Sequence, residues 1–335
     1  MSRRRHSRST RAAIGGGLVI GLIVTTAACG SEAAKTAPFS VPHVYDLNVD
    51  PAKGIAEVDP NRGQVVTAEQ LRNLLDQQLA WHGLTLVEVM RAARADRAEV
   101  QVWIDQLTQN TADLTATVGL AYGPVAARAF NQQWAQHTQF LVDYAVAIGQ
   151  KNKSAAEQAR SALVDYAHDS GSFFSTATGG ILPAGAVQDL LNTHVAHMLT
   201  MIEADQAGNV AGTVDAAVTD SAYLSTIAKG LSTAIAQQNP TWFPGATDTP
   251  LAALCSLVTS GTGSYLDSLI ITGDPASSLV LNADQALVST TGATTAAIIG
   301  LSPNFGGADS TARAEAAKAA LATANAYALA HPPAP

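Results

Sequence analysis

Cysteine is almost absent from this 335-residue chain, which contains only Cys29 and Cys255. At most one disulfide can therefore form within one molecule, which excludes the disulfide-dense scaffolds of small secreted domains. Such a chain depends on a hydrophobic core for its stability. With 47% hydrophobic residues it is long enough to build a sizeable one.

Positive charge is missing from a long C-terminal stretch, because no lysine or arginine occurs between Lys229 and Arg313. Serine, threonine, glycine and alanine dominate there instead. Two apolar runs at 251–270 and 277–299 predict buried helices rich in small residues. We therefore expect residues 246–335 to form a helical C-terminal region with a disordered tail.

Catalytic signatures are missing as well. The chain has no nucleophile elbow of the form G-x-S-x-G, no H-E-x-x-H and no closely spaced cysteine and histidine set. Its glycine-containing stretch SGTGSY follows no predicted strand, so a phosphate loop is not expected either. The sequence therefore predicts no catalytic residue and favours a protein that is not an enzyme.

Residues 1–28 have the layout of a secretory signal. Five arginines between Arg3 and Arg11 precede the apolar run AAIGGGLVIGLIVTTAA, and the small residues of TTAAC lead directly to Cys29. This junction resembles a bacterial lipobox, whose cysteine becomes the lipidated first residue of the mature chain. The alternative is an uncleaved membrane anchor, but the apolar run is short for a span of about 20 residues. The route of export, Sec or Tat, stays open.

A lipoprotein of this kind is expected at the extracytoplasmic face of the cell membrane. With Cys29 lipidated, Cys255 is a spare thiol and no intramolecular disulfide is expected. Residues 29–66 contain four prolines and predict a flexible tether. Loss of residues 1–28 removes five of the 19 basic residues and none of the 27 acidic ones, so the mature net charge is −13. Such a surface repels nucleic acid and anionic lipid, which leaves the acyl chains as the membrane contact.

The segment 67–245 has the apolar periodicity of helices almost throughout. It begins with TAEQ, a capping box in which Thr67 and Gln70 satisfy each other's backbone N–H groups. Breaks at AYGP, TGGILP and QAGN divide it into three helical hairpins. Their helices are expected at 67–94 and 97–118, at 124–150 and 153–176, and at 184–206 and 210–236. The predicted fold class is all-α, a bundle of repeated antiparallel hairpins similar to a four-helix bundle.

Several short motifs in this segment resemble those of an uncharacterised family of small helical-bundle proteins from spore-forming Gram-positive bacteria. The motifs are LLDQQLAWH (74–82), NTADL (110–114), LAYG (120–123), LLNTH (190–194) and NPTWFP (239–244). The resemblance implies a four-helix type of fold, although this chain has three hairpins where two are expected. It implies no activity, cofactor or partner.

One histidine position recurs in the hairpins, in QQLAWH, QQWAQH and NTHVAH. Each of these histidines falls on the apolar stripe of its helix and should face the core. Residues at similar heights on the second helices extend this set into a polar layer across the middle of the bundle. The predicted layer comprises His82, His137, His168, His194, His197, Asn110, Asp113 and Asp169.

Two interpretations of this layer stay open. A shared hairpin would reuse one packing solution, so the histidines are expected chiefly as hydrogen-bonded core residues that fix helix register. The leading hypothesis is then an envelope protein without enzymatic activity, which binds an unknown protein or small ligand and needs no cofactor. The alternative is a bundle in which the five histidines bind copper, zinc, iron or a haem. Against this stands the absence of the Glu-x-x-His pattern typical of di-iron bundles.

Overall fold

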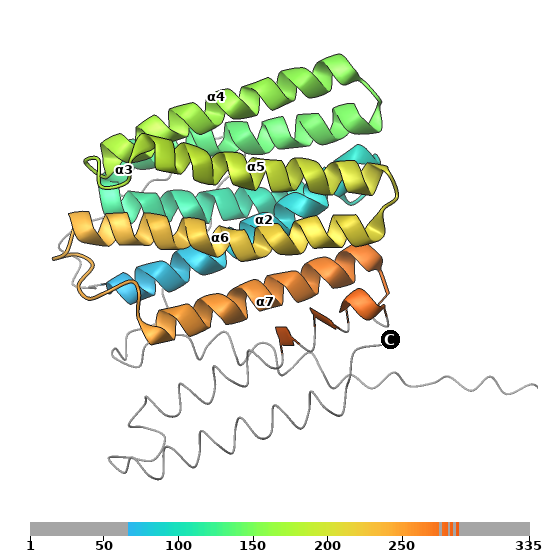
Figure 1. Cartoon of the computed structure of the whole chain (residues 1–335). Helices are drawn as coiled ribbons and strands as arrows, with labels where there is room; N and C mark the ends of the chain where they lie inside the picture. Colours follow the sequence, from blue (N-terminus) through green and yellow to red (C-terminus); the bar gives the residue numbers. More distant parts are fainter. Residues whose placement is uncertain (1–65, 275–276, 281, 284–285, 288–335) are drawn as a thin grey trace, which may run out of the picture.

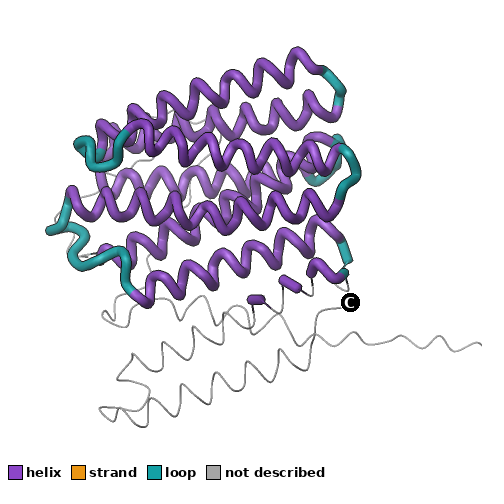
Figure 2. The backbone as a smooth tube through the Cα atoms, in the orientation of Figure 1, coloured by secondary structure: helices purple, strands orange, loops and turns teal. Residues whose placement is uncertain are grey.

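The computed structural model describes residues 66–274, 277–280, 282–283 and 286–287. These residues form an all-α bundle, as predicted (Figures 1 and 2). The long helices are α2 (Ala68–Arg94), α3 (Val100–Gly149), α4 (Lys153–Ala177), α5 (Ala184–Gln206), α6 (Val210–Gln238) and α7 (Pro250–Thr272). The predicted signal peptide, Cys29, the tether and most of the C-terminal region lie outside the described residues.

Helix α3 is two antiparallel halves that meet at Gly123. This glycine has φ 78° and ψ 178°, a conformation that only glycine adopts readily, and Pro124 then starts the second half. Across the turn, Asn131 Nδ2 donates to Thr115 Oγ1 at 3.1 Å. The hairpin boundary expected at AYGP is therefore confirmed, and the six predicted helices agree closely with α2, the two halves of α3, α4, α5 and α6.

The predicted capping box at the start of α2 is also confirmed. Gln70 N donates to Thr67 Oγ1 at 3.1 Å, and Thr67 N donates to Gln70 Oε1 at 2.8 Å. These bonds satisfy two of the backbone donors that a helix start leaves unpaired. They fix where α2 begins and thus which of its side chains face inward.

Helix α2 lies at the centre of the bundle, where it packs against α3, α5, α6 and α7 (Figure 1). A central helix is buried around most of its circumference, so it must bury polar side chains too. One of them, Arg72, forms a buried ion pair with Asp76 at 2.7 Å and also donates to Ser256 Oγ at 2.9 Å. That contact ties α7 to the start of α2.

Two hydrophobic clusters fill the bundle, one toward each end. The first includes Leu86, Leu141 and Met201, and the second includes Leu79 and Phe130. On α2, on both halves of α3, on α5 and on α6, a buried polar residue stands between members of the two clusters. These residues are His82, Asn110, His137, His194 and Asp220. A polar layer across the middle of the bundle is therefore present.

A helix expected within residues 251–270 is present as α7, but only one of its faces is buried, and Leu257 on the other is 55% exposed. Its Cys255 is 2% exposed and disulfide-bonded, so the expectation of a spare thiol is wrong; the bonded partner lies outside the described residues. Among the described helices, none combines the length and the apolar character that crossing a membrane requires.

Candidate metal centre

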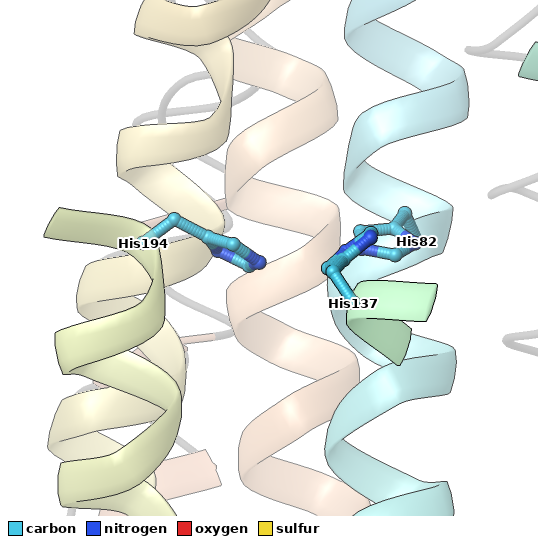
Figure 3. A group of neighbouring side chains, drawn as sticks. All are labelled: His82, His137 and His194. Atoms are coloured by element: carbon cyan, nitrogen blue, oxygen red, sulfur yellow. The ribbon is translucent and has the colours of Figure 1, made fainter. Parts of the chain in front are cut away.

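Three of the predicted histidines meet in the polar layer. His82 comes from α2, His137 from the second half of α3 and His194 from α5, and their rings point toward one another (Figure 3). One ring nitrogen from each lies within 4.8 Å of the others. The three residues are 0%, 1% and 3% exposed. Helices distant in sequence thus converge on one small, buried site, which we call the histidine triad.

A carboxylate contacts the Nδ1 side of the His194 ring. Asp220 on α6 is 1% exposed, and its two oxygens lie 2.9 and 3.0 Å from His194 Nδ1. Burial by itself raises the pKa of Asp220, but the contacts with His194 and His197 outweigh it and lower the pKa. The ionised carboxylate accepts the Nδ1 proton, so Nε2 is the His194 nitrogen that remains to bind an ion. That nitrogen has no hydrogen-bond partner in the described part of the chain.

Aromatic rings wall the triad. Trp134 lies 4.8 Å from His82 and 4.5 Å from His137 between ring centroids, and Tyr166 stacks on His137 at 4.6 Å with an interplanar angle of 16°. Burial in this wall lowers the pKa of His137 to about 3, with repulsion from His194 adding to it. Burial also lowers the pKa of His82 well below its usual range. Both rings are therefore neutral near pH 7, the form that binds metal ions.

His197 lies beside the triad rather than in it. It is half-buried, and its Nδ1 lies 3.2 Å from Asp220 Oδ1, the oxygen that also contacts His194. Asn110 is 1% exposed and lies in the layer, as predicted. Asp113 is half-buried and accepts from Gln109 Nε2 at 3.0 Å.

The prediction that His168 and Asp169 belong to the layer is wrong. Both side chains are exposed, and they contact each other at 3.3 Å on the surface. The buried face of α4 carries Ala167 and Ser170 instead. Height along a hairpin suggested His168, but each residue turns about 100° around a helix axis, so height alone does not choose the inward face.

Asp220 is the residue that the sequence reasoning missed. A signal was present in the sequence, because Asp220 falls on the apolar stripe of α6, with Ala216, Ala217 and Leu224 at i − 4, i − 3 and i + 4. The aromatic partners Trp134 and Tyr166 carried no such signal, because aromatic residues on an apolar stripe are ordinary core residues.

The geometry of the triad suits a small ion. Zinc–nitrogen bonds of 2.0–2.1 Å in a tetrahedral site require nitrogens about 3.3 Å apart, so side chains now within 4.8 Å need only modest rotation. Ring centroids 5.3 Å apart for His82 and His137, and 5.9 Å apart for His82 and His194, leave no room for a porphyrin. The haem alternative therefore does not fit these residues, whereas a single metal ion does.

Comparison of the chain with protein families, with curated proteins and with solved structures finds no match. The resemblance to small helical-bundle proteins of spore-forming bacteria stays a prediction. The site is interpreted from its own geometry.

Proposed function

We propose that this protein is a metal-binding helical bundle of the cell envelope, which holds one transition-metal ion between His82, His137 and His194. The unpartnered ring nitrogens of the buried triad carry this proposal. Both nitrogens of His82, Nδ1 of His137 and Nε2 of His194 are buried without a hydrogen bond in the described part of the chain.

A purely structural layer would leave a different pattern. Buried polar atoms are nearly always hydrogen-bonded, and leaving one unpaired costs about 1–3 kcal/mol. In the triad, Nδ1 of His194 is bonded to Asp220 and the His137 ring also faces the backbone of Trp134, but four of the six ring nitrogens have no hydrogen bond at ordinary geometry in the described part of the chain. A shared cation satisfies the converging lone pairs together, and this favours metal binding over the role in helix register that the sequence suggested first.

The donor set indicates which ions suit the site. Neutral imidazoles bind zinc and copper well, whereas magnesium and calcium require oxygen ligands. A carboxylate behind a ligating histidine is a common feature of zinc sites, where it fixes the tautomer of the ring. We therefore propose zinc or copper(II), with His194 as the ligand that Asp220 orients and with a fourth position left for a small exogenous ligand.

Metal analysis of the tag-free mature protein tests this proposal. We expect close to one equivalent of zinc or copper, and its loss in His137→Gln and His194→Gln. His168→Gln is the matched control, because that ring lies on the surface; it should retain the metal. Circular dichroism establishes that each variant is folded. The proposal is refuted if the folded wild type contains no metal, takes up neither added ion and keeps its unfolding temperature in the presence of a chelator. Such a result would favour a structural or partner-binding bundle.

The envelope location is a separate proposal. The basic and apolar layout of residues 1–28 and the small residues before Cys29 support a lipid anchor on the extracytoplasmic face. Cys29→Ala should release the protein from the membrane fraction, and mass spectrometry of the mature wild type should find an acylated N-terminal residue. Cys29 is the only other cysteine of the chain, so a thioether at Cys29 and an intramolecular disulfide at Cys255 exclude each other. The proposal therefore requires that the acylated protein lacks this disulfide, and a mature protein that keeps it and carries no acyl group would refute the proposal.

A further inference from the structure

We propose that Asn110 is a positioning residue of the metal site, whose carboxamide oxygen accepts the ring N–H of His82 and so turns the other His82 nitrogen toward the ion. This inference rests on the proposed function. It assigns to Asn110 the task for His82 that Asp220 performs for His194.

The orientation of the Asn110 amide is determined by its neighbours. Asn110 Nδ2 donates to the backbone oxygen of Gln78 at 2.8 Å, which places the nitrogen on that side and the oxygen on the other. Gln78 is itself held, because its Nε2 donates to Asp113 O at 3.1 Å and its Oε1 accepts from Thr117 Oγ1 at 3.0 Å. This network joins α2 to the first half of α3, so the amide is fixed by the packing of two helices.

The oxygen that remains lacks a partner. Asn110 is 1% exposed, and its Oδ1 is one of the buried polar atoms of the described residues without a hydrogen bond. An amide oxygen has two lone pairs and accepts well from a ring N–H. Asn110 Oδ1 is therefore a buried acceptor within the polar layer that can take a hydrogen bond from a neighbouring N–H group.

His82 supplies the matching donor. A neutral imidazole always carries one N–H, and His82 is 0% exposed with both ring nitrogens unpartnered. Asn110 lies beside this ring, because it bonds the backbone oxygen of Gln78, which stands one helical turn before His82 on α2. A small ring rotation brings the N–H onto Asn110 Oδ1. The lone pair of the other nitrogen then points at the centre of the triad.

The two backing groups differ in charge. Asp220 is an ionised carboxylate with hydrogen bonds to His194 already formed, whereas Asn110 is neutral and its bond to His82 is not yet closed. Asp220 therefore holds His194 more strongly than Asn110 holds His82, with or without a bound ion. We expect the apparent metal affinity to depend on both groups.

Competition titrations with zinc alone, on the full mature protein, test the role of Asn110. Asn110→Ala should weaken zinc affinity by about 10- to 100-fold, the usual loss when the partner of a ligating histidine is removed. Asn110→Asp should restore binding, because a carboxylate oxygen also accepts from His82. Asn131→Ala is the matched control, since it removes a similar amide contact between helix halves, Nδ2 to Thr115 Oγ1, away from the triad; its affinity should equal that of the wild type.

The tautomer of His82, read by ¹⁵N NMR, separates the two proposals. We expect one tautomer in the wild type and a mixture in Asn110→Ala, with and without zinc. Suppose that the wild type binds zinc and that Asn110→Ala has the same zinc affinity and the same His82 tautomer. This result would refute the role of Asn110 but not the metal site. No zinc binding, together with a tautomer that depends on Asn110, would overturn the metal site alone. If Asn110→Ala does not fold, the same comparison is made with Asn110→Ser.

Discussion

Replacing His137 by phenylalanine should change how the stability of the metal-free protein depends on pH. The ring is 1% exposed, stacks on Tyr166 and has its pKa lowered to about 3, chiefly by burial. Phenylalanine keeps a flat ring on Tyr166 but cannot take up a proton. The variant therefore removes the titration and preserves most of the packing.

The sign follows from proton binding in the two states. In the unfolded chain a histidine takes up a proton near pH 6.5, whereas folded His137 stays neutral down to about pH 3. Between these values the unfolded state binds more protons, so the contribution of His137 to stability is complete above pH 6.5 and declines as the pH falls. The decline is about 1.4 kcal/mol per pH unit, which amounts to about 2 kcal/mol at pH 5.

Other buried groups titrate in the same range. His82, whose pKa burial also lowers, adds to the loss of stability in acid. Asp267 acts in the opposite direction. Burial raises its pKa to about 7, so as the pH rises the folded state keeps this proton to a higher pH than the unfolded state does. Both residues are present in the wild type and in His137→Phe. The difference between the two profiles therefore isolates His137.

Urea unfolding with a chelator at pH 7.5, 6 and 5 measures this difference. Relative to the wild type, His137→Phe should gain about 2 kcal/mol in unfolding free energy between pH 7.5 and pH 5. His168→Gln should follow the wild-type profile, because that ring is in solvent in both states. Parallel profiles for the wild type and His137→Phe would show that His137 takes up a proton in the folded bundle as readily as in the unfolded chain, and would refute a neutral His137.

Two further changes test the packing around α2. A Cβ at Gly149 would lie 2.2 Å from the backbone oxygen of Arg94, so Gly149→Ala should lower the unfolding free energy in urea by about 1–3 kcal/mol. Gly185→Ala is the control, because no atom lies within 4 Å of the added Cβ, and it should be neutral or slightly stabilising. Arg72→Met leaves Asp76 buried without its cation and should cost about 3–5 kcal/mol at pH 7. Adding Asp76→Leu to Arg72→Met should recover most of this loss; equal thermal stability of the single and double variants would contradict the argument.

The helices themselves were predictable because their signals are local. The Thr67 cap, the Gly123–Pro124 turn and the apolar stripes each act within a few residues, and the structure confirms the helices they predict. The same stripes placed His82 and His137 in the core. Cys255 was mistaken for a spare thiol, because a bond to a distant part of the chain leaves no local pattern.

By itself, the sequence determined that the described chain is all-α and that histidines recur on the core faces of its hairpins. Only the tertiary structure decided that His82, His137 and His194 converge while His168 faces solvent, and that Asp220 stands behind His194. The physical reason is rotation about the helix axes. Periodicity shows which face of one helix is apolar, but the packing of every neighbour decides which side chains on those faces meet.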